Sequence, residues 1–130
     1  MSSKVLEVFH KVHALVTAAD GYTADGHPAM RRHGGEWQAC SVDDAAAVKF
    51  TLLGAVWRCL PAADDAGKTQ QFSAFVDIFR EGLRRAGVSL EPSRNRERGH
   101  FNALDAWSAD KTQDQVAEAI HLAVKHLSTP

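Results

Sequence analysis

The sequence predicts an all-α fold, a bundle of four to five helices with a long loop between helices one and two. Apolar residues recur at helical spacing in several segments. No segment alternates apolar and polar residues over a useful strand length. With 130 residues, 45% of them hydrophobic, the chain can bury one core, so residues 1–130 are expected to form a single helical domain.

The first helix is expected over residues 3–19. Ser2 or Ser3 can cap its start, because a serine hydroxyl accepts a hydrogen bond from a free backbone N–H of the first turn. Its apolar stripe consists of Val5, Phe9, Val12 and Val16. This three- and four-residue spacing is typical of one buried helix face.

The segment 20–39 is expected to be the long loop, because glycines and a proline lie there among polar residues. Loops of this length are uncommon in compact domains unless they bind something or fold back on the body. We therefore expect Tyr22 and Trp37 to anchor the loop to the core.

The second helix is expected to begin after Ser41, Asp43 or Asp44, which suit a helix N-cap, and to end before Pro61. Its apolar residues cover nearly all sides, which predicts a helix surrounded by its neighbours. Gly54 costs about 1 kcal/mol relative to alanine inside a helix. A close helix–helix approach at Gly54 would explain that cost.

The third helix has the clearest apolar stripe, and Thr69 is its expected cap. Gly87 is placed to end the helix in a left-handed conformation. The stripe consists of Phe72, Phe75, Val76, Phe79, Leu83 and Ala86.

The C-terminal part is expected to hold a polar connection over residues 88–99, a short helix around Leu104 and Trp107, and a last helix. Thr112 and Gln115 have the spacing of a capping box, in which each side chain bonds the backbone N–H of the other residue. The last helix should therefore begin directly after Thr112.

Several segments share a pattern with known sequences: residues 21–26, 40–44, 50–55, and 106–107 before the helix start at 110–119. Together they resemble an uncharacterised family of small helical bacterial proteins, a domain of unknown function. That family has a Trp- or Gly-rich first loop, a C-x-x-G-A helix and a W-N-D turn before a Thr-capped helix. This chain has Thr51 in place of the helix cysteine, and Ser108 to Asp110 in place of the compact N-D. The resemblance implies a fold type and no catalytic residues.

Charge is nearly balanced, with 15 Lys+Arg against 16 Asp+Glu. The chain therefore lacks the overall field of a dedicated nucleic-acid or membrane-surface binder. One segment differs: residues 80–100 hold six arginines and three glutamates, a net charge of +3. The candidate binding residues in this arginine-rich segment are Arg80, Arg84, Arg94, Arg96 and Arg98.

Arginine favours bidentate contact with carboxylates and phosphates. We expect an acidic protein surface or self-association as the partner, and no membrane. Nucleic acid is less favoured, because no aromatic residue lies among these arginines to stack a base. The alternative that the helical arginines form an ordinary solvated face stays open, because Asp77 and Arg80, like Glu81 and Arg85, are spaced as helical ion pairs.

Two Glu-x-x-His pairs, Glu7 with His10 and Glu118 with His121, have the spacing used in di-iron carboxylate bundles. Both pairs lie away from their apolar stripes, and the second helix has no glutamate. We therefore expect surface side chains, with no metal and no cofactor. A small metal-dependent enzyme using these pairs stays open as the alternative function. Further loop candidates for such a site are His27, His33 and Cys40.

The N-terminal residues lack the apolar run of a signal peptide. The most apolar stretch, residues 45–60, is shorter than the ~20 residues needed to span a bilayer. Cys40 and Cys59 are too few for a disulfide framework, so we expect two reduced thiols in a cytoplasmic protein, with one disulfide as the alternative. The favoured function is a small non-enzymatic interaction or regulatory protein that binds through the arginine-rich segment and the long loop.

Overall fold

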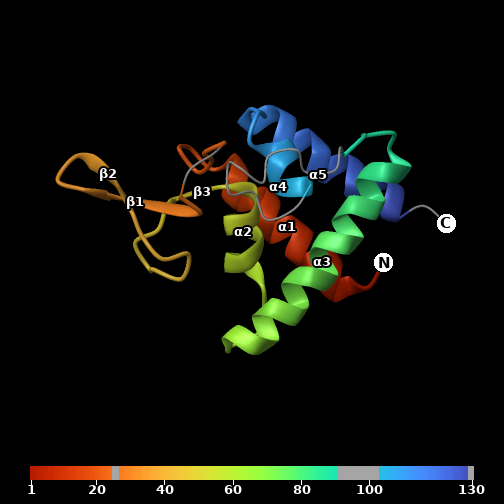
Figure 1. Ribbon diagram of the computed structural model, residues 1–130, viewed down its shortest axis with the longest axis horizontal. Helices are drawn as coiled ribbons and strands as arrows, with labels where there is room; N and C mark the ends of the chain where they lie inside the picture. The colour runs from red at the N-terminus through yellow and green to blue at the C-terminus, as the bar shows by residue number, and fades with distance from the viewer. Residues whose placement is uncertain (25–26, 91–102, 129–130) are drawn as a thin grey trace.

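Helices dominate the computed structural model, which describes residues 1–24, 27–90 and 103–128 (Figure 1). The described residues also form a small sheet, so the prediction of an all-α fold is wrong and the chain is mixed α and β. The elements in chain order are α1 (Ser3–Thr17), β1 (Ala29–His33), β2 (Glu36–Ala39), β3 (Lys49–Phe50), α2 (Leu52–Cys59), α3 (Asp65–Arg85), α4 (Ala103–Ser108) and α5 (Gln113–Leu127).

The sheet has three antiparallel strands in the order β2-β1-β3. A two-residue turn joins β1 to β2, and Gly34 and Gly35 have φ of 59° and 84° there. Positive φ at both positions is the geometry of a type I′ hairpin turn, which glycine adopts without strain. The prediction of a loop over residues 20–39 is therefore wrong. The hairpin strands are mostly polar and exposed, so they lack the apolar alternation by which a strand is read from sequence.

Helix α2 is shorter than predicted, because part of its expected span forms strand β3. The predicted start after residues 41–44 is wrong. The helix begins at Leu52, where the Thr51 hydroxyl accepts a hydrogen bond from the Gly54 N–H at 3.1 Å. Pairing of β3 with β1 holds the chain extended up to Phe50, which leaves Thr51 as the cap.

Two cationic side chains hold the turn segment 40–48 against the helices. An Arg58 guanidinium nitrogen donates to the carbonyl oxygens of Val42 at 2.8 Å and Asp44 at 2.9 Å. The Lys68 ammonium lies 3.3 Å from the Asp43 carboxylate, and the Lys68 side chain is only 11% exposed. These polar contacts place a segment that buries little apolar surface.

Most of the core lies between the helices. Helix α1 packs against α2 and α5, and α3 packs against α5. The Phe9 ring lies 4.5 Å from the Phe75 ring and 5.3 Å from the Phe79 ring, between centroids. Helices α3 and α5 approach closely at Gly82, where a Cβ would lie 3.0 Å from Ala123. The apolar stripes predicted for the first and third helices are confirmed as buried at most positions, while Val5, Phe72 and Ala86 are partly buried. Helix α5 also buries one face, made of Val116, Ala119, Ile120 and Ala123.

Helix ends agree with the sequence at most positions. The capping box of Thr112 and Gln115 is confirmed, and Gly87 has the left-handed φ of 83° expected after α3. The predicted cap Thr69 is wrong: α3 begins one turn earlier, where the Asp64 carboxylate accepts a hydrogen bond from the Gly67 N–H at 2.6 Å. A carboxylate suits this position, since it also faces the positive end of the helix dipole.

Gly54 does mark a close approach, but the neighbour is not a helix. A Cβ on Gly54 would lie 2.1 Å from the carbonyl oxygen of Pro28. The same oxygen accepts a hydrogen bond from the Thr51 N–H at 3.1 Å. The predicted helix–helix approach is therefore wrong, and Gly54 instead joins α2 to the chain entering β1.

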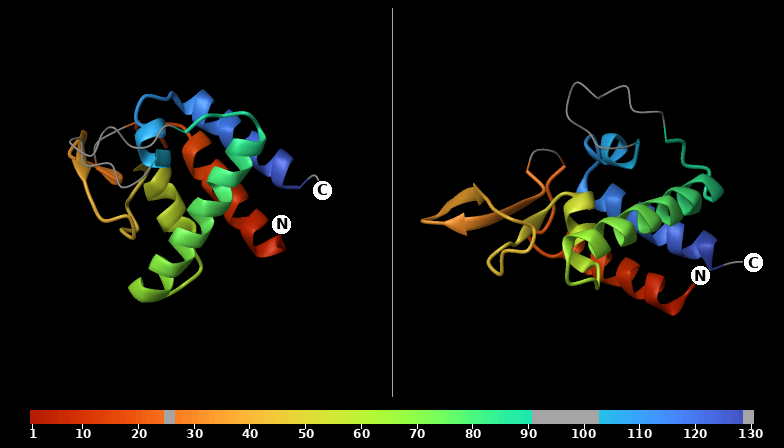
Figure 2. Two further views of the ribbon diagram at one scale, coloured as in Figure 1. Left: turned by 45° about the vertical axis from the view of Figure 1, so that its right-hand side comes forward. Right: turned by 60° about the horizontal axis from the view of Figure 1, so that its bottom comes forward.

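Tyr22 anchors its segment to the helical body, as predicted. Its hydroxyl lies 3.0 Å from the Ser108 carbonyl oxygen and 3.1 Å from that of Lys111, so it donates to the turn between α4 and α5. Trp37 does not reach the core. It lies on the hairpin, which extends away from the helices (Figures 1 and 2).

A second long-range contact closes the end of α1. The Gln113 side-chain amide donates to the carbonyl oxygens of Val16 at 2.7 Å and Ala18 at 3.0 Å. Val16 lies in the last turn of α1, where a helix leaves its carbonyls without a hydrogen-bond donor inside the helix. The Ala18 carbonyl, at the C-cap, also accepts a hydrogen bond from the Gly21 N–H at 2.9 Å. Helix α5 therefore caps α1.

Candidate functional site

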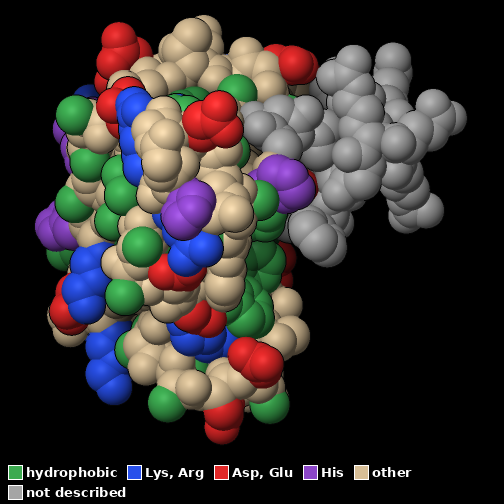
Figure 3. All heavy atoms as spheres, turned by 90° about the vertical axis from the view of Figure 1, so that its left-hand side faces the viewer, with side chains coloured by type: hydrophobic (Ala, Val, Ile, Leu, Met, Phe, Trp, Pro, Cys, Tyr) green, Lys and Arg blue, Asp and Glu red, His purple; other side chains and the backbone are tan. Residues whose placement is uncertain are grey.

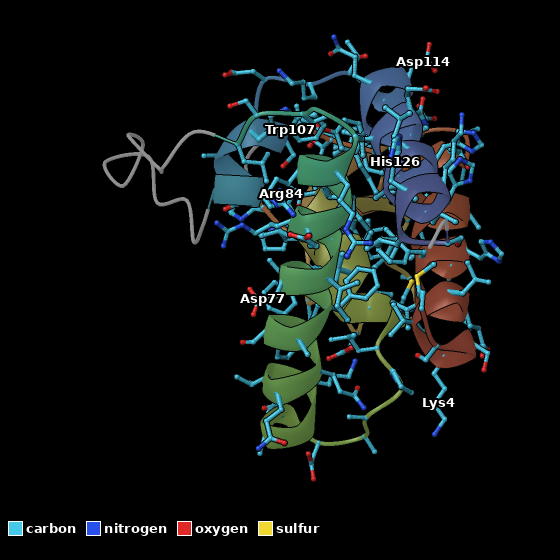
Figure 4. The ribbon with its side chains drawn as sticks, turned by 90° about the vertical axis from the view of Figure 1, so that its right-hand side faces the viewer. Lys4, Asp77, Arg84, Trp107, Asp114 and His126 are labelled. Atoms are coloured by element: carbon cyan, nitrogen blue, oxygen red, sulfur yellow. The ribbon has the colours of Figure 1, made fainter. Side chains whose placement is uncertain are left out.

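Two of the predicted binding residues, Arg80 and Arg84, lie exposed on the outer face of α3. Figure 4 shows Asp77 and Arg84 on the same side of this helix, directed away from α1 and α5. No ion pair joins Arg80 to a carboxylate in the part of the chain that the structure describes. The predicted pair of Asp77 and Arg80 is therefore wrong.

Glu81 binds both neighbouring arginines. Its carboxylate accepts hydrogen bonds from Arg84 at 2.6 and 2.8 Å and from Arg85 at 3.1 Å. The predicted pair of Glu81 and Arg85 is confirmed, and Arg84 shares the same carboxylate. These hydrogen bonds, from Arg84 first and then Arg85, lower the pKa of Glu81 to about 2. Of the three arginines, Arg80 alone forms no ion pair with a carboxylate of the described residues.

A cavity of about 430 Å³ lies beside these side chains. Val88 and Leu90 give it an apolar wall, and Arg80 and Arg84 add two guanidinium groups. Such a combination suits an apolar group that carries a carboxylate. The described residues that line the cavity are Asp77, Arg80, Glu81, Arg84, Val88, Ser89 and Leu90.

The sequence predicts only a polar connection after residue 87, so it does not single out Val88 and Leu90. Their spacing after the helix-ending Gly87 is the available signal, because an apolar residue just past a helix often packs back on it. The remaining predicted binding residues, Arg94, Arg96 and Arg98, lie outside the described residues.

The Glu-x-x-His pairs lie on exposed helix faces, as predicted. Glu7 forms an ion pair with Lys11 at 3.2 Å, and His10 is exposed. Glu118 and His121 are exposed on α5. Within residues 1–24, 27–90 and 103–128, no three His, Cys, Asp or Glu side chains come together as a group that could hold a metal ion.

The loop candidates for a metal site, His27, His33 and Cys40, belong to no such group among the described residues. His27 and His33 are exposed, and Cys40 and Cys59 are free thiols. Burial raises the pKa of Cys40, and it raises that of Cys59 to about 11. Both thiols are therefore protonated at neutral pH, which makes them weak nucleophiles.

The hairpin carries an aromatic and basic cluster that the sequence analysis did not find. The Arg32 guanidinium carbon lies 4.7 Å from the centroid of the Trp37 ring, and the Lys49 ammonium lies 4.1 Å from it. Arg32 stands opposite Trp37, and Lys49 opposite Met30, so strand alternation places these side chains on one face of the sheet. Strand pairing alone brings them together.

The chain matches no family model, no curated protein and no solved structure. No helix in the described ranges has the length and apolar character that crossing a membrane requires. Function must therefore be inferred from the geometry of the chain itself.

Proposed function

We propose that the protein is a small, non-enzymatic interaction protein that binds an acidic protein surface through the outer face of α3. The observation that carries the proposal is the exposed Arg80 guanidinium beside the apolar wall of Val88 and Leu90, where Arg80 forms no ion pair with any described carboxylate. The arginine-rich segment that continues through Arg94 and Arg96 adds positive charge to the same part of the chain.

Arg80 is expected to contribute more to binding than Arg84. A partner carboxylate can bond Arg80 bidentately without displacing any group of this chain. At Arg84 the same carboxylate must compete with Glu81, which already bonds that guanidinium through two nitrogens. The gain at Arg84 is therefore a small difference between two similar ion pairs.

A cytoplasmic location is part of the proposal. Cys40 and Cys59 are both free thiols, and unpaired thiols are typical of proteins in reducing compartments. The same location suits a protein whose partner is another intracellular protein.

Titration with a blocked peptide of six glutamates, followed by the backbone amide signals of residues 77–90, tests the α3 site. We expect saturable shifts in these signals, and the variant Arg80→Gln should weaken binding by about fivefold. Arg85→Gln is the matched control, since it removes the same charge from a side chain that lines no part of the cavity. Equal weakening by both variants, or no shifts, would contradict the α3 site.

The alternative function has its own test. A stoichiometric transition metal in protein purified without chelators would instead favour the metal-dependent enzyme.

A further inference from the structure

The hairpin presents a free strand edge to solvent. Strand β2 lies at the outside of the sheet, and the Cys40 N–H donates to the Ala29 carbonyl at 3.2 Å. Residue pairs in an antiparallel ladder alternate between hydrogen-bonded and non-hydrogen-bonded pairs. The Cys40–Ala29 bond therefore shows that Cys40, and every second residue of β2 before it, turns its backbone groups toward β1. The backbone N–H and C=O groups of Trp37 and Ala39 therefore point away from β1, along the free edge.

Positive charge gathers on one face beside this edge. Arg32 and Lys49 lie over the Trp37 ring on that face, and neither forms an ion pair with a described carboxylate. On the opposite face, Arg31 is neutralised by Asp44 at 3.1 Å. We call the free edge of β2 together with Arg32, Trp37 and Lys49 the hairpin face. Figure 3 shows the end of the molecule that carries the hairpin, where basic, acidic and hydrophobic side chains lie close together.

We propose that an extended acidic segment of another protein binds the hairpin face as a fourth strand beside β2. Its backbone pairs with the outward groups of Trp37 and Ala39, and its Asp or Glu side chains lie on the side of Arg32 and Lys49. Main-chain hydrogen bonds give the affinity in this mode, and the two cations give the preference for acid. This site is separate from the α3 site and stands on its own observations.

A second copy of the chain fits the hairpin face less well. Two-fold pairing of β2 with itself would bring the Arg32 and Lys49 side chains of both copies to the same sheet face. None of the described strand residues on that face carries a carboxylate to offset them, since Glu36 alternates to the other side. Like charges at such an interface oppose association.

A single-stranded nucleic acid also fits less well. A base would need an open face of the Trp37 ring to stack on, but Arg32 and Lys49 already lie within 5 Å of the ring centroid. The outward N–H and C=O groups of β2 match a peptide backbone instead.

Binding of two blocked octapeptides to the full chain tests the proposal, one alternating Glu with Val and the other Lys with Val. The Glu peptide should shift the amide signals of Trp37 and Ala39 and slow their hydrogen exchange, and the Lys peptide should not. Replacing both cations, Arg32→Glu with Lys49→Glu, should reverse this preference. The matched control Arg31→Gln removes a cation from the opposite face, so the affinity should stay within about twofold.

The backbone part of the proposal has its own variant. Ala39→Pro removes an N–H that points to solvent, which an edge strand tolerates, and should weaken binding of the Glu peptide by about fivefold. If Ala39→Pro disturbs the amide spectrum of β1, the charge reversal decides alone. Equal affinity for both peptides would overturn the proposal. So would tighter binding of an oligothymidylate to the hairpin face, or self-association of the wild-type chain that Ala39→Pro abolishes.

Discussion

The helical body and the segment from Tyr22 to Phe50 are held together in different ways. In the body, α1, α3 and α5 bury interlocking apolar side chains, such as the rings of Phe9 and Phe79. Between α1 and α2, the chain buries Ala29 and Phe50 in the core. The rest of it is placed mainly by a strand ladder and by single polar groups, such as the Tyr22 hydroxyl and the Arg58 guanidinium. Stability therefore depends on filled volume in one region and on particular donors and acceptors in the other.

The largest effect is expected in the body, from Phe79→Ala. Phe79 is fully buried and contacts the rings of Phe9 and Phe75. Loss of the ring and the cavity it leaves should lower the free energy of unfolding by about 3–5 kcal/mol, measured by chemical denaturation. The control Asp77→Ala, on the exposed face of the same helix, should change it by less than about 0.5 kcal/mol. Similar values for the two variants would contradict a core held by volume.

The next effect is expected where the two regions meet, from Gly54→Ala. Alanine favours a helix by about 1 kcal/mol over glycine, but its Cβ would lie 2.1 Å from the Pro28 carbonyl oxygen. Because that atom belongs to the backbone and also accepts the Thr51 N–H, it cannot move without cost. We expect a net loss of about 2 kcal/mol in the free energy of unfolding. An unchanged or higher unfolding midpoint would mean that Pro28 does not seat against α2.

A smaller effect is expected from Tyr22→Phe, which leaves the ring and removes the hydroxyl. The carbonyls of Ser108 and Lys111 lose a shared donor, so the free energy of unfolding should fall by about 1–2 kcal/mol. A value near zero in urea denaturation would show that water replaces this hydroxyl at no cost, and that the segment is positioned by other contacts.

Tyr22 also predicts how stability varies at high pH. Burial raises its pKa from 10.0 to about 12. Because the folded pKa is above the unfolded one, the contribution of the neutral phenol is complete below pH 10 and is lost as the pH rises toward 12. Tyr22 is the one tyrosine of the chain, so absorbance of the phenolate should titrate near 12 in folded protein and near 10 in denaturant. Cys59 shifts in the same direction, to about 11, so stability curves of the wild type and Tyr22→Phe should be compared.

The smallest effect on stability is expected at the partly exposed carboxylate of Glu81. Hydrogen bonds from Arg84 and Arg85 lower its pKa to about 2, so its contribution is present above pH 4.5 and is lost as the pH falls toward 2. Titration of the carboxyl carbon by NMR should give that midpoint. Glu81→Gln should barely change stability but should tighten binding of the glutamate peptide, since it releases both arginines. Weaker binding would contradict competition between Glu81 and the partner.

The contrast between the helical body and the hairpin segment also explains which parts of the fold the sequence predicts. Phe75, Phe79 and Leu83 repeat at four-residue spacing, and this periodicity predicts helix α3 together with its buried face. The hairpin has no such pattern, because its strands bury little, and only the adjacent Gly34 and Gly35 indicate a turn. Local propensity cannot reveal that Lys49 and Phe50 leave a helical run to pair with β1.

The candidate sites differ in the same respect. Arg80 and Arg84 are neighbours on one helix, so local charge in the sequence is enough to select them. Arg32, Trp37 and Lys49 become neighbours only through strand register, which depends on contacts distant in sequence. The sequence therefore predicts the α3 site in part and misses the hairpin face.

The contact of Gln113 with the end of α1 has a kinetic consequence. The bonded carbonyls lie 97 and 95 residues away along the chain, so this cap forms only after α5 has reached α1. Closing so long a separation is slow compared with forming a helix, because chain entropy must be lost before the contact exists. We therefore expect docking of α5 to come late in folding. Before it docks, the Val16 carbonyl lacks this donor and the part of α1 that packs on α5 is uncovered.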